Sequence, residues 1–303
     1  MIATATIGLK TRINQNLVDA SGLTKPSLLG WQLLYILPTA VFTNDFFLSN
    51  FWIRTFASKS DKDLWIGVLI ASVMVLIILT LVGLTGLIAI WTGAFDPSNS
   101  KEDSSAAFFY LLDLLPSWTV GLVLVMTVTL STAAFGSLQS AMVSTASNDL
   151  FRNQLSIWWA RLVVVLIMLP IIVVALKAPS ILQIYLISDL MSASTIPILL
   201  LGLSKRFQFM HGAEVMVGGL GGLFTVFLFG TVYYGNVRQG IHLILLGEGL
   251  YAGDWSVFGA FVAAPFGGLI WGLGASCVRY GFQLRNKKSR NTSGHTQTSP
   301  ATL

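Results

Sequence analysis

The sequence predicts an all-α polytopic membrane protein with about seven transmembrane helices. The chain of 303 residues is 54% hydrophobic and only 10% charged, whereas soluble proteins carry about 25% charged residues. Its mean hydropathy is +0.74, and long uncharged runs alternate with short charged segments. This pattern excludes a soluble globular enzyme and indicates several crossings of a lipid bilayer.

Each expected span is an apolar run long enough to cross a hydrocarbon core of about 30 Å. The run at 64–91 contains no charged residue, and the run at 179–203 contains one acid, Asp189. The stretch at 103–116 carries Asp113, and we expect it to be a short helix on the membrane surface. The expected spans are residues 27–53, 64–91, 120–146, 156–176, 179–203, 215–234 and 255–278.

The basic residues of the connections predict the orientation of the chain, because cytoplasmic loops carry an excess of Lys and Arg. Alternate connections collect them into two groups, and the larger group includes Arg152, Arg206 and Arg279. The segment at 1–26 is therefore expected outside, and the polar tail at 284–303 is expected to be disordered and cytoplasmic. The net charge of +5 follows from this topology and does not indicate a nucleic-acid partner.

Asp45 is a first candidate for function, because a charged side chain within a bilayer costs a few kcal/mol. It follows Asn44 in a span that also contains Pro38, and a proline removes one backbone hydrogen bond from a helix. This span is therefore a candidate for a discontinuous helix, whose unwound backbone lines a cavity and contacts a solute or ion. The alternative is a kinked helix, with Asp45 near the headgroups or hydrogen-bonded to a neighbouring helix.

Asp189 is the second acid within an expected span, and it is a candidate for an ion path. Its neighbours Ser192, Ser194 and Thr195 also allow a simpler reading, a polar contact between two helices. Glycines in the last two spans favour close helix packing. They include two pairs at GxxxG spacing, Gly218 with Gly222 and Gly268 with Gly272.

The span at 120–146 is rich in hydroxyl side chains, among them Ser131, Thr132 and Ser137. Because hard cations prefer oxygen ligands, we expect these three residues to face an ion path. Hydrogen bonds between helices would explain much of the same composition. No histidine lies within an expected span, and no metal cluster is visible, so the sequence does not predict an enzyme or a cofactor.

Two segments carry a resemblance to a known family. The segment at 51–60 reads FWIRTFASKS and follows the first span, and the segment at 139–151 reads QSAMVSTASNDLF and ends the hydroxyl-rich span. Both resemble motifs of the sodium:solute symporter family, and the likeness is closest to its urea-permease branch and the fungal relatives of that branch. The order of the spans agrees with this family over nearly the whole chain.

The resemblance implies a secondary active transporter with an inverted-repeat fold of five plus five core helices. Residues 27–203 would be the second repeat, and residues 204–283 would hold two peripheral transmembrane helices. The first repeat has no counterpart here, so we expect a truncated family member, or a membrane partner that supplies the missing helices. The fungal likeness implies a plasma membrane location.

The resemblance also implies symport of a small polar solute, urea or a related compound. Asn44 and Asp45 match the inner substrate gate, where sugar carriers of the family have aromatics, so these two residues are expected to contact a small, polar or cationic solute. The alternative is a non-transporting membrane binding or regulatory subunit derived from a transporter.

The coupling ion stays open between sodium and a proton. The family's sodium-binding hydroxyl pair falls where this sequence has Ala133 and Ala134. Sodium would then depend on the neighbouring hydroxyls, whereas a proton would use one of the two acids within the spans.

Overall fold

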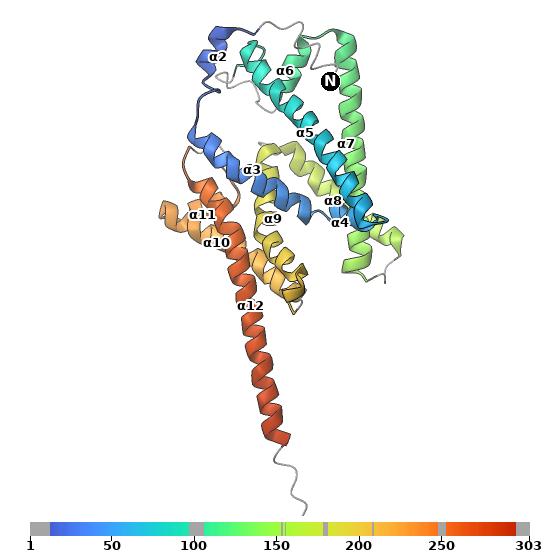
Figure 1. The fold of residues 1–303 in the computed structure, drawn as a ribbon, viewed down its shortest axis with the longest axis vertical. Coiled ribbons are helices and arrows are strands. Elements are labelled where there is room, and N and C mark those ends of the chain that lie inside the picture. The colour runs from blue at the N-terminus through green and yellow to red at the C-terminus, as the bar shows by residue number, and fades with distance from the viewer. Residues whose placement is uncertain are drawn as a thin grey trace, which may run out of the picture. The chain divides into compact units, whose positions relative to one another are not determined.

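The computed structural model describes residues 13–96, 106–152, 154, 156–177, 181–207, 209–247 and 253–294. Within these ranges every regular element is a helix. The helices form two compact units, and both can be followed in Figure 1. The first unit contains Met1–Ser27 and Ser49–Leu166, and the second contains Leu28–Leu48 and Ile167–Leu303.

The first unit is built around two long apolar helices, α5 and α7. Helix α5 starts sharply because the side chain of Ser60 accepts a hydrogen bond from the backbone N–H of Asp63. Asp61 and Asp63 in its first turn also complement the helix dipole. The helices of this unit are α2 (Gln15–Ser21), α4 (Ser49–Phe56), α5 (Asp61–Trp91), α6 (Ala107–Asp113), α7 (Ser117–Thr145), a π-helix (Ala146–Leu150) and the first part of α8 (Ile157–Lys177).

The second unit holds the larger buried core. Helices α9, α10 and α12 pack against one another, and α3 packs on α9. The core includes Ile36 of α3, Leu186 and Leu190 of α9, Val226 of α10 and Phe261 of α12, all 0–1% exposed. The helices of this unit are α3 (Leu28–Phe47), α9 (Ile181–Leu203), a 3₁₀ turn (Lys205–Phe207), α10 (Gly212–Tyr234), α11 (Val237–Ile244) and α12 (Ser256–Gly294).

The two GxxxG pairs meet each other where α10 crosses α12. A Cβ atom added at Gly218 would lie 2.9 Å from the carbonyl oxygen of Gly268, and one at Gly222 would lie 2.7 Å from that of Ala264. One added at Gly272 would lie 3.2 Å from the carbonyl oxygen of Glu214. Side chains at these positions would push the backbones apart, so the predicted packing role of the glycines is confirmed.

The predicted all-α polytopic class is confirmed, and the expected spans fall on helices. Among the described residues, five helices are long and apolar enough to cross a membrane: α5, α7, α9, α10 and α12. The first and fourth expected spans are helical as α3 and α8, but they are not among these five. Helix α3 carries several polar residues, and the apolar part of α8 is the shorter stretch Ile157–Val173. The predicted short helix before the third span is the seven-residue α6, about 10 Å long and too short to cross.

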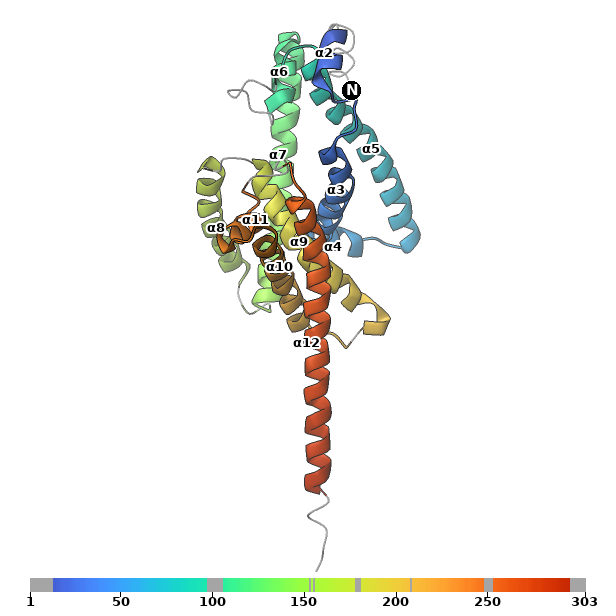
Figure 2. The same cartoon turned by 90° about the vertical axis from the view of Figure 1, so that its left-hand side faces the viewer.

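Two segments differ from the expectation. Helix α3 runs without a break through Pro38 to Phe47, and the interruption comes at Leu48, before α4 begins. Prolines are tolerated in such helices because neighbouring groups satisfy the freed carbonyl. Figures 1 and 2 both show α12 as one unbroken helix that continues to Gly294, where a disordered tail from 284 was expected. Between Gln283 and Gly294 no proline or glycine interrupts it, so the helix propagates beyond the apolar span. The rest of the expected tail, 295–303, and residues 1–12 lie outside the described residues.

Candidate functional site

A polar cluster lies where α3 packs on α9 in the second unit. We call it the α3–α9 cluster, and it consists of Asn44 and Asp45 of α3 with Tyr185 and Asp189 of α9. Its surroundings are apolar, since Ala40 of α3 and Leu186, Leu190 and Ala193 of α9 are 0–1% exposed. The sequence places these polar residues inside two otherwise apolar helices, which bring them together.

Asn44 links the two helices within the cluster. Its side-chain amide interacts with the carboxyl group of Asp189 and with the hydroxyl group of Tyr185. Asn44 is 8% exposed and Asp189 is 1% exposed, so this contact is almost closed to the surroundings. The Oδ1 atom of Asp189 is buried and has no hydrogen-bond partner among the described residues. One acceptor atom is therefore left for a ligand.

The cluster carries two acids and no described cation. Asp45 is exposed, and its charge acts on both Asp189 and Tyr185. Among the residues that the structure describes, the one ion pair joins Arg279 to Glu214, and neither is part of this cluster. A buried carboxylate without a counter-charge is costly, and binding of a cation would offset that cost.

The structure brings together three of the six residues that the sequence singled out. Asn44, Asp45 and Asp189 form one cluster, although Asp189 was predicted in the ion path and not beside the solute contacts. Tyr185 was missed, but its spacing of four residues from Asp189 puts both side chains on one helix face, and this signal could have found it.

The three hydroxyl residues predicted for the ion path, Ser131, Thr132 and Ser137, all lie in α7 of the first unit. Ser131 and Thr132 are exposed. The hydroxyl group of Thr132 donates to the carbonyl oxygen of Val128 at 2.8 Å, within its own helix. Ser192, Ser194 and Thr195 of α9 likewise donate to carbonyl groups of their own helix. The hydroxyl groups of Thr132 in α7 and of these three residues in α9 therefore satisfy backbone carbonyls of their own helices.

A second polar region follows at the end of α7, in the segment that resembled the family motif. A cavity of about 560 Å³ lies between the last turns of α7, the π-helix and α8. Single-turn π-helices are frequent at functional sites. The guanidinium group of Arg161 in the cavity wall lies 5.3 Å from the ring centre of Trp158. The polar residues that line this cavity are Gln139, Ser140, Ser144, Ser147, Asn148 and Arg161.

These helices define the chain as an integral, all-α polytopic membrane protein. The chain is similar to Spermidine transporter DUR31 of Candida albicans (strain SC5314), with 51% identity over 282 residues. The match covers 92% of this chain and 54% of that protein, so the chain spans about half the length of its relative. No family model matches the chain. No solved structure matches it either.

Proposed function

We propose that the protein takes part in the membrane transport of a small cationic solute of the polyamine class. The observation that carries this proposal is the buried carboxylate of Asp189 in the α3–α9 cluster, whose Oδ1 atom has no hydrogen-bond partner and no counter-charge among the described residues. The similarity to a protein named as a spermidine transporter supports the same solute class. A role in transport also agrees with the expectation that the protein is not an enzyme.

The chemistry of the cluster fits a protonated amine better than a neutral amide such as urea. An ammonium group donates up to three hydrogen bonds, and its positive charge supplies the counter-charge that Asp45 and Asp189 lack. Urea would leave both carboxylates without a counter-charge. We therefore favour a cation over urea, which the resemblance to urea permeases alone would suggest.

The apolar surroundings of the cluster fit the remaining part of such a solute. Polyamines carry methylene chains between their amino groups, and burial of methylenes is favourable by about 0.8 kcal/mol each. Exposed apolar side chains, Phe42 of α3 with Ile184 and Met191 of α9, lie on the two helices that hold the acids. We infer that one amine binds the buried carboxylate while the methylene chain contacts these exposed apolar side chains.

The sodium:solute symporter family and the coupling ion belong to the same proposal. We infer that the chain contributes the second repeat and two further helices of such a carrier. Sodium would use the exposed hydroxyl oxygens of α7, including Ser131 and Thr132, whereas a proton would use an acid of the cluster. A plasma membrane location and an external N-terminus complete the arrangement.

Uptake into cells tests the solute class directly. Cells that express the protein and control cells with an empty vector would be given radiolabelled spermidine or radiolabelled urea. We expect saturable spermidine uptake above the vector control, and no more than weak competition by excess urea. Saturable urea uptake without spermidine uptake would contradict the cationic solute. Omission of sodium from the medium then separates sodium coupling from proton coupling.

A further inference from the structure

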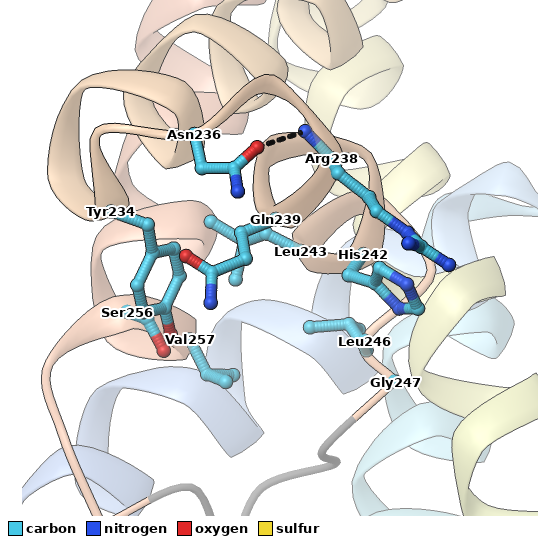
Figure 3. A pocket seen from close by; sticks show the side chains of 10 residues that line it. All are labelled: Tyr234, Asn236, Arg238, Gln239, His242, Leu243, Leu246, Gly247, Ser256 and Val257. Atoms are coloured by element: carbon cyan, nitrogen blue, oxygen red, sulfur yellow. Dashed lines mark hydrogen bonds between the residues drawn. The ribbon is translucent and has the colours of Figure 1, made fainter.

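A second cavity, of about 350 Å³, lies in the second unit between the end of α10, α11 and the start of α12 (Figure 3). This volume is within the range of roughly 300–1,000 Å³ that small-molecule sites occupy. Its position relative to the membrane follows from its walls. The α10 span ends at Tyr234 and the α12 span begins at Ser256, and both residues line the cavity. The cavity therefore lies at the ends of two spans, where lipid headgroups meet the protein.

Helix α11 supplies the polar wall, and it is held firmly against α10. A Cβ atom added at Gly230 of α10 would lie 3.0 Å from the Cα atom of Gly240 in α11. One added at Gly240 would lie 2.9 Å from the carbonyl oxygen of Phe227. The side chain of Asn236 caps α11 by accepting a hydrogen bond of 2.9 Å from the backbone N–H of Arg238. The close approach of Gly240 to α10 determines which face of α11 lines the cavity.

The face that looks into the cavity is basic. Arg238 and His242 are one turn apart, and Figure 3 shows their side chains next to each other, with Gln239 also in the wall. Among the lining residues that the structure describes, none is acidic. The carboxylate of Asp254 accepts hydrogen bonds from the hydroxyl groups of two lining residues, Tyr234 and Ser256. Helix α11 therefore contributes the side-chain donors of Arg238, Gln239 and His242 to the described part of the wall.

The remaining wall is apolar and consists of Leu243, Leu246 and Val257. Leu246 is buried although its φ angle is 45°, a backbone conformation that non-glycine residues rarely adopt. A basic wall beside an apolar wall, at the level of the headgroups, matches an amphiphilic anion. Guanidinium groups form paired hydrogen bonds to phosphate oxygens, and an imidazole N–H adds a further donor.

We propose that this cavity binds the phosphate group of an anionic molecule, through Arg238 and His242, with a phospholipid headgroup or a soluble phosphate as the two sources. The apolar wall would hold the glycerol and upper acyl carbons of a lipid. The site is separate from the α3–α9 cluster, because none of the cluster residues lines it. The proposed phosphate site therefore does not depend on whether the protein carries a polyamine.

The test is a binding titration on the purified full chain in detergent, followed by thermophoresis of the labelled protein. The probes are dioctanoyl phosphatidic acid, dioctanoylglycerol and inorganic phosphate. We expect saturable binding of phosphatidic acid and none of dioctanoylglycerol, which has the same acyl chains without the phosphate. Binding of inorganic phosphate with comparable affinity would support the phosphate site and identify a soluble ligand as its source.

Two variants and one control connect the binding to this cavity. Arg238→Gln should weaken binding of phosphatidic acid at least about tenfold, because charge-assisted hydrogen bonds are lost. Gln239→Glu should also weaken it, since a negative charge then faces the ligand from an exposed position that does not disturb packing. Arg206→Gln removes the same charge from an exposed residue of the 3₁₀ turn outside the cavity and should leave binding unchanged. Equal binding of dioctanoylglycerol, equal losses in Arg206→Gln and Arg238→Gln, or no binding of any probe would overturn the proposal.

Discussion

The two units of this protein use their glycines in opposite ways. In the second unit, a Cβ atom at Gly218, Gly222 or Gly272 would meet the backbone of a neighbouring helix. In α5 of the first unit, no atom of the described residues lies within 4 Å of a Cβ atom at Gly67, Gly83 or Gly86. Close helix packing therefore builds the core of the second unit, whereas these glycines of α5 take no part in close packing within the first unit.

Polar residues show the same contrast between the units. Helix α9 buries Asp189 and connects it to Asn44 of another helix. In α7, the hydroxyl groups of Thr127, Thr129 and Thr132 donate to carbonyl groups of their own helix at 2.8 Å. Polar composition alone therefore does not locate a binding site. A binding site needs a polar group that its own helix leaves unsatisfied.

The largest expected effect concerns the α3–α9 cluster. Asp189→Asn keeps the shape of the side chain and removes its charge, so spermidine uptake should fall about a hundredfold, in line with the loss of a buried charge pair. Asp45→Asn should cost less, about tenfold, because Asp45 is exposed and solvent screens its charge.

Uptake would be measured at matched surface expression, with Ser188→Ala as the control. Ser188 is the exposed neighbour of Asp189, so Ser188→Ala should leave spermidine uptake unchanged. A loss of uptake in Asp45→Asn that exceeds the loss in Asp189→Asn would reverse the assignment of the two acids.

The next effect concerns packing. Gly222→Leu should destabilise the protein by about 3 kcal/mol, because the new side chain would collide with backbone atoms of α12. Gly86→Leu is the matched change in α5, where the space is open, and it should leave stability nearly unchanged. Thermal unfolding of the purified variants measures both. Similar melting temperatures for the two variants would remove the contrast between the units.

A smaller effect is expected at the opposite end of α10 from the basic cavity. Glu214 is buried, and its carboxylate accepts from the backbone N–H of His211 and pairs with Arg279 of α12. Arg279→Met should cost about 2 kcal/mol, because Glu214 stays buried without its counter-charge. The double variant Arg279→Met with Glu214→Gln should recover part of this loss in a thermal melt. No recovery would mean that packing of the arginine, and not its charge, stabilises this end.

The smallest expected effect is a pH-dependent change in the stability of the fold, caused by ionisation of Asp254. Burial opposes ionisation of this carboxyl group, but hydrogen bonds from Ser256 and Tyr234 outweigh it and lower the pKa of Asp254. A lowered pKa stabilises the fold above the unfolded value, near pH 4, and this contribution disappears as the pH falls through the folded value.

Asp254→Asn should therefore lower stability by about 1 kcal/mol at pH 7, with a smaller difference from the native protein below about pH 4. Melting curves between pH 3 and pH 7 check this prediction. A difference that is constant over this range would assign the effect to shape and not to charge.

The helical spans could be predicted from the sequence because length and apolarity decide them. The roles of Gly218 and Gly222 were also accessible, since their spacing has a direct steric meaning. The sequence did not reveal that Asp189 belongs with Asn44, because that contact depends on how α3 crosses α9. The break at Leu48 was misplaced to Pro38–Asp45, because a proline signals a lost hydrogen bond but neighbouring groups decide whether the helix ends.

Equilibrium binding of radiolabelled spermidine to the purified protein in nanodiscs tests the central claim most directly. The α3–α9 cluster predicts saturable binding to the native protein and binding about a hundredfold weaker in Asp189→Asn, with the variant folded to the same melting temperature. Equal dissociation constants for the two proteins would contradict the assignment of this cluster as the cation site.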